Sequence, residues 1–170
     1  MGPSPDGGPP PAALVVTQVA LPEALAAACA LQRVEVDVVP TPVGCVAVCR
    51  DVAEGAPAAV ARAITSLLPG VPALLLEQRD GRVAAARWSD GAEAGAVAPG
   101  LALEGAPAVV EQLLLGQATA AEQPGACTSV GMSRWQATRT LAAVTRATRR
   151  AARRAARRAR DRAAGGGTGS

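Results

Sequence analysis

Apolar residues follow two different periods along residues 13–116. Strand-like runs either alternate, as in Val34–Val38 where the valines share one face, or are apolar throughout, as in Cys45–Cys49. The predicted strands are 14–19, 34–38, 45–49, 71–78 and 83–88. Helical spacing begins at three prolines, Pro22, Pro57 and Pro107, because proline favours the first turn of a helix.

These elements predict the order β-α-β-β-α-β-β-α. Asp80-Gly81 joins two of the strands and favours a tight hairpin, since both turn positions need a positive φ. Short helices between hairpins indicate an α+β fold with a small, mostly antiparallel sheet and helices on one face. A ferredoxin-like split βαβ arrangement fits this order best, with a C-terminal Arg/Ala-rich helix added. Residues 91–100 are expected to form a loop.

The composition predicts one domain with extensions at both ends. Proline and glycine dominate the first twelve residues, which leaves that arm with little to bury. The expected divisions are a disordered arm at 1–12, the α+β domain at 13–116, a linker at 117–131, a basic helical tail at 132–164 and a disordered Gly-rich end at 165–170.

The absence of histidine excludes His-based catalytic triads and His-containing zinc sites. No Gly-rich phosphate loop of the P-loop type occurs either. We therefore expect no enzyme activity, no catalytic residues, no cofactor and no metal. Tyrosine and phenylalanine are absent as well, which disfavours base-specific recognition of single-stranded RNA.

Two side-chain sets remain candidates for chemistry. The four cysteines, Cys29, Cys45, Cys49 and Cys127, have no C-x-x-C spacing, and we expect free thiols that pack as small apolar side chains; a reactive cysteine is the alternative. Three acids, Glu35, Asp37 and Glu77, form a carboxylate cluster if their strands are neighbours. The simpler interpretation is that they lie on the solvated face of the sheet.

Charge divides the chain into two parts of opposite sign. Residues 1–129 hold 6 arginines against 13 acids, a net charge of −7, whereas residues 130–170 hold 11 arginines and one acid, a net charge of +10. The chain contains no lysine and is rich in alanine, glycine and proline, as expected of a high-GC genome. The use of arginine instead of lysine therefore says nothing about the partner of the basic segment, whereas the position of the positive charge along the chain is informative.

The tail has the composition of a helix that begins near Ser133, a predicted N-cap. At about 100° per residue most of its arginines fall on one face, opposite a shallow alanine face. We predict that this face binds nucleic acid with little sequence specificity. The predicted binding residues are Arg139, Arg146, Arg149, Arg150, Arg153, Arg154, Arg157, Arg158 and Arg160.

The partner of the tail is therefore expected to be DNA or RNA. The alternative partners are an acidic protein and an anionic membrane surface. A further alternative is that the tail is solvated and has no partner, and that the protein is a protein–protein interaction or assembly module. No secretory signal or membrane span is recognised, so a cytoplasmic location is expected. No sequence feature assigns an oligomeric state.

Overall fold

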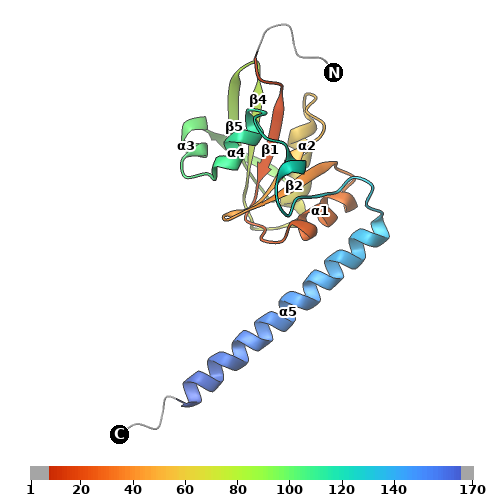
Figure 1. The fold of residues 1–170 in the computed structure, drawn as a ribbon, viewed down its shortest axis with the longest axis vertical. Coiled ribbons are helices and arrows are strands. Elements are labelled where there is room, and N and C mark those ends of the chain that lie inside the picture. The colour runs from red at the N-terminus through yellow and green to blue at the C-terminus, as the bar shows by residue number, and fades with distance from the viewer. Residues whose placement is uncertain (1–7, 166–170) are drawn as a thin grey trace.

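The structure is a computed structural model that describes residues 8–165 (Figure 1). It is an α+β fold with a seven-stranded antiparallel sheet, five α-helices and one 3₁₀ helix within those residues. In chain order the elements are β1 (Ala12–Val16), α1 (Pro22–Leu31), β2 (Val36–Thr41), β3 (Gly44–Cys49), α2 (Ala56–Leu67), β4 (Ala73–Arg79), β5 (Arg82–Ser89), β6 (Ala92–Val97), α3 (Pro99–Leu103), α4 (Ala108–Leu114), η1 (Ala120–Glu122), β7 (Cys127–Thr128) and α5 (Arg134–Gly165).

The strands lie in the order β6-β5-β4-β1-β3-β2-β7, and every neighbouring pair is antiparallel. The sheet is therefore larger than predicted. The Asp80-Gly81 turn is present, with φ values of 50° and 73°. Asp90-Gly91, with φ values of 50° and 78°, makes a second turn of the same kind and leads into β6, where the sequence predicted a loop.

Helices cover both faces of the sheet, so the prediction of helices on one face is wrong. Side chains on the two faces alternate along β1: Ala13 and Val15 pack with α1 and α2, whereas Leu14 packs with α4. The second face is closed by Val110 and Leu113 of α4, together with Ala120 of η1. Strands β1 and β3, at the centre of the sheet, are apolar on both faces because helices shield both faces from water there.

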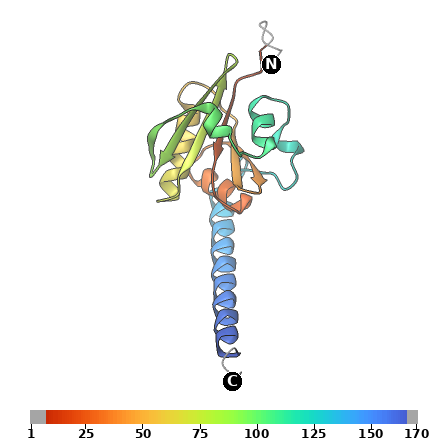
Figure 2. The ribbon, with the colours of Figure 1, turned by 90° about the vertical axis from the view of Figure 1, so that its left-hand side faces the viewer.

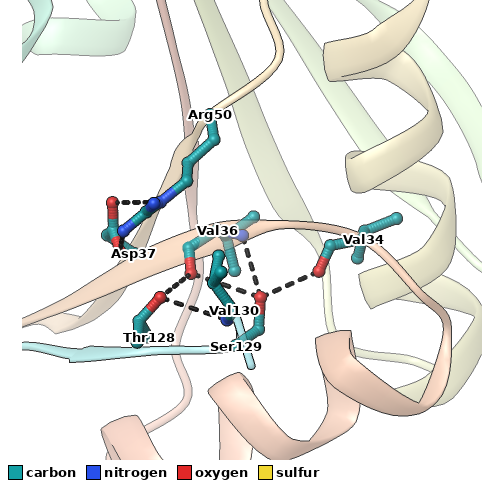
Figure 3. A network of polar contacts seen from close by, with 7 residues as sticks. All are labelled: Val34, Val36, Asp37, Arg50, Thr128, Ser129 and Val130. Atoms are coloured by element: carbon teal, nitrogen blue, oxygen red, sulfur yellow. Dashed lines mark hydrogen bonds and ion pairs between the residues drawn. The ribbon is translucent and has the colours of Figure 1, made fainter. Parts of the chain in front are cut away.

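Residues 117–131 extend the sheet rather than separate it from the tail. Within this range β7 pairs antiparallel with β2, opposite Asp37 and Val38. Ser129, which is buried, accepts a hydrogen bond from the Val36 amide (2.9 Å) and donates one to the Val34 carbonyl (2.8 Å), as Figure 3 shows. The stretch expected to be a linker thus fixes the start of α5 to the body.

Helix α5 leads away from the body as one continuous helix (Figures 1 and 2). Ser133 and Gln136 form a reciprocal cap, in which each backbone amide donates to the other's side chain. This agrees with the predicted N-cap. Residues 1–7 and 166–170, which include most of the arm and end expected to be disordered, lie outside the described residues.

Candidate nucleic-acid interface

The nine predicted arginines all lie on α5 and are all exposed. Taking about 100° per residue, eight of them fall within an arc of about 140°, and Arg158 lies roughly 40° beyond it. From Arg139 to Arg160 the face is about 30 Å long, at about 1.5 Å per residue. We call these nine side chains the basic face: Arg139, Arg146, Arg149, Arg150, Arg153, Arg154, Arg157, Arg158 and Arg160.

The attachment of α5 to the body sets the direction of the basic face. Ala137 is fully buried (0% exposed), and Leu141 and Val144 are half-buried, where the first turns of α5 pack against α1. In the same helical projection these three residues lie at least about 80° outside the arc of eight arginines. The basic face is therefore directed away from α1, toward solvent.

The positive charge of the basic face is not paired with acidic side chains in the described part of the chain. Among residues 8–165 the ion pairs are Arg50–Asp37 and Arg79–Glu77, both in the body, and no arginine of α5 takes part in one. Every residue from Thr145 to Ala164 is exposed. The guanidinium groups are thus hydrated and free to meet an external anion.

The body end of the basic face carries an aromatic side chain. Trp135 is 65% exposed, and the Arg139 guanidinium lies 4.5 Å from its ring centroid, which is a cation–π distance. Beside them is an open groove of about 670 Å³ between the start of α5 and the segment that follows β7. Trp135 is not among the predicted binding residues, although its spacing of four residues from Arg139 is the signal that pairs the two side chains on one helix.

The three acids do not form a cluster. Strands β2 and β4 are separated by two strands, and Asp37 and Glu77 lie on opposite faces of the sheet. Asp37 instead accepts two hydrogen bonds from Arg50, at 2.9 and 2.8 Å (Figure 3). Burial opposes ionisation of Asp37, but the bonds from Arg50 and Thr128 and the Arg50 charge together lower its pKa. In the described part of the chain, no group of three or more acids or cysteines has a metal-binding arrangement.

The cysteines are free thiols, as predicted, and three of the four are buried. Desolvation raises the pKa of Cys29 and of Cys49 to about 12 and that of Cys127 to about 11. Burial raises the pKa of Cys45 too. Since the thiolate is the nucleophile, these surroundings disfavour reactivity near neutral pH.

Comparison with protein-family models, with curated proteins and with solved structures finds no significant match to this chain. Over residues 8–165, none of the helices is both long and apolar enough to span a bilayer.

Proposed function

We propose that this chain is a non-catalytic protein that binds nucleic acid through α5, with little sequence specificity. The observation that carries the proposal is the basic face: about 30 Å of exposed arginines, on a helix that leads away from the body, that form no ion pair within residues 8–165. Arginines spaced along one face contact successive phosphates and release their counterions. DNA and RNA backbones both satisfy this chemistry.

The acidic body restricts where a polyanion binds. Residues 1–129 carry a net charge of −7, which repels phosphates from the sheet and its helices. Phosphate contacts are therefore confined to α5. Because the basic face has few side chains that read bases, the affinity depends mainly on the salt concentration. About 5–8 neutralised phosphates correspond to a log–log salt slope of roughly −5 to −7.

The body itself is proposed to be a ferredoxin-like core with added strands. The order β4-β1-β3-β2, in which β1 and β2 flank β3, supports this arrangement. Strands β5 and β6 extend it at one edge and β7 at the other. A fold of this kind fixes no activity, so the function is argued from α5 alone.

Binding can be tested with two charge-matched variants of the full chain. One replaces Arg150, Arg153 and Arg157 of the basic face by Gln; the other replaces the exposed body arginines Arg62, Arg82 and Arg87 by Gln. Each removes three positive charges. We expect the first variant to reduce the salt slope for duplex binding by about 3, because each lost phosphate contact lowers it by about 1, and the second to leave it unchanged.

An equal effect of both variants would show that net charge, not the basic face, governs binding. A chain cut at Gly116 is a poorer test, because it also removes β7 and the turns of α5 that bury Ala137. Circular dichroism of both variants checks that the fold is retained.

A protein–protein interaction module is the second candidate, and one observation favours it. Strand β6 is an edge strand whose outer side is unpaired within the described residues, and Ala92–Ala96 are exposed. Such an edge accepts an additional strand from a partner. Two results together would support this alternative: no nucleic-acid binding at low salt, and self-association in analytical ultracentrifugation that is abolished by Glu93→Pro, a change in β6 at a position without a positive φ.

A further inference from the structure

Trp135 is a large aromatic side chain exposed at the end of a charged helix. Its ring is 65% exposed, while the other tryptophan of the chain, Trp88, is 4% exposed. In the helical projection Trp135 lies within the arc of the basic face, and Arg139 is its nearest member along the helix. A ligand that follows the arginines toward the body therefore arrives at the indole ring.

The groove beside Trp135 has a mixed apolar and polar lining. Val130 and Met132 supply apolar surface, and the Gln136 side-chain amide nitrogen and the Thr140 hydroxyl supply hydrogen-bonding groups. Its volume, about 670 Å³, is within the usual range for sites that hold small ligands. A flat aromatic group with polar edges suits this combination of ring, apolar surface and hydrogen-bonding side chains.

We infer that Trp135 and this groove receive an unpaired nucleobase of a strand whose phosphates lie along the basic face. The inference rests on the proposed function and narrows it to single-stranded nucleic acid. A duplex keeps its bases stacked inside, so it offers the basic face only phosphates, whereas a single strand also exposes the faces of its bases. Stacking on tryptophan is tolerant of sequence, because every base has a π-face.

The surroundings favour a nucleobase over a lipid surface. The side of α5 opposite the basic face carries alanine from Ala151 onward, which offers little area for insertion into a bilayer. One tryptophan alone does not make an interfacial helix. The Arg139 guanidinium covers one face of the ring, 4.5 Å from its centroid, so a base would stack on the other face with this cation close by for its phosphate.

Tryptophan fluorescence of the full chain tests the inference, since Trp135 is exposed and Trp88 is buried. The chain is titrated with an oligothymidine strand and with a duplex of the same length at the same salt concentration. We expect the single strand to quench Trp135 and the duplex to quench it little. Trp135→Leu should lower the affinity for the single strand about tenfold and leave duplex affinity and the salt slope unchanged.

Arg160→Gln, at the far end of the basic face, is the control. It should reduce the salt slope for both ligands by about 1 and leave the preference for the single strand intact. Circular dichroism checks folding, and Trp135→Phe, which keeps an aromatic ring, should restore most of the preference.

The possible outcomes separate the inference from the function on which it rests. If single strand and duplex bind equally and Trp135→Leu changes neither affinity, the stacking site is disproved while the basic face stands. If neither ligand binds at low salt, both proposals fail. Quenching of Trp135 by anionic phospholipid vesicles but not by oligothymidine would assign the site to a membrane surface and overturn the inference.

Discussion

Gly44 lies where the β2–β3 hairpin passes closest to the backbone that follows β1. Its φ is 133°, and a Cβ at this position would overlap the Thr17 carbonyl oxygen and lie 2.8 Å from the Gln18 Cα. Those neighbours are backbone atoms, held by the bond from the Thr17 amide to the Cys45 carbonyl (3.0 Å), so they cannot move aside cheaply. Only glycine fits here.

Gly95 in β6 provides a matched comparison, because its φ is 140° and a Cβ there would meet nothing within 4 Å. Both Gly44→Ala and Gly95→Ala carry the cost of an unfavourable φ, but only the first adds a clash. We expect Gly44→Ala to lower the free energy of unfolding by about 1–3 kcal/mol more than Gly95→Ala. Urea denaturation measures both, and similar losses would mean that the hairpin relaxes away from Thr17.

At the scale of elements, β7 is short and depends on side-chain bonds for its attachment. Ser129→Ala removes the partner of the Val36 amide, and Val36 is fully buried, so the amide is left without a hydrogen bond. An unsatisfied buried donor costs about 1–3 kcal/mol. We expect that loss in the free energy of unfolding measured with urea.

Ser89→Ala is the control, since it removes an exposed hydrogen bond to Asp90 (3.0 Å) and should cost less than about 0.5 kcal/mol. If the two variants lose equal stability, Ser129 does not hold β7 on the sheet. A larger loss of unfolding free energy for Ser129→Ala than for Ser89→Ala would also explain how a two-residue strand, β7, holds the start of α5 against the body.

Elements with local signals were predictable from the sequence, and those formed by distant pairing were not. The hairpin at Asp80-Gly81 and the helix after Ser133 follow from turn and capping chemistry within a few residues. Asp90-Gly91 carries the same turn signal, but Ala92–Val97 has few β-branched or alternating apolar residues because β6 is exposed. The pairing of β7 with β2 joins residues about 90 positions apart, which no local pattern reports.

The candidate site divides in the same way. The basic face was predictable because helical periodicity is a local property. Its direction was not, because that depends on burial of Ala137 against α1. The groove at Trp135 was missed for the same reason: it needs the segment after β7 to lie beside α5.

At the scale of the whole molecule, charge is separated in space as well as along the chain. The arginines from Arg146 onward lie on a part of α5 that leads away from the acidic body (Figure 2). Charges farther apart than the Debye length, about 10 Å at 0.1 M salt, are largely screened from one another. The body therefore does little to offset repulsion among the arginines. Residues 145–164 are all exposed, so no packing against the described body stabilises the outer part of α5.

The stability of this outer segment should consequently depend on salt. Six arginine pairs lie four residues apart between Arg146 and Arg162, and together they oppose helix formation by roughly 1–3 kcal/mol. We expect hydrogen exchange of residues 145–164 in the full chain to slow several-fold as salt rises from about 0.05 M to about 0.5 M, because screening weakens the repulsion. A polyanion should slow exchange at low salt in the same way.

A double variant, Arg150→Glu with Arg158→Glu, separates this mechanism from a general effect of salt on the chain. It converts four of the six repulsive pairs to attractive ones, since each substituted position has an arginine four residues away on both sides. Salt then screens more attraction than repulsion. The hydrogen-exchange rate of residues 145–164 should therefore stay constant or increase as the salt concentration rises, and the exchange rates in the sheet should be the same as in the parent chain. If the variant keeps the salt response of the parent chain, arginine repulsion does not set the stability of α5, and a polyanion would then have no such repulsion to relieve.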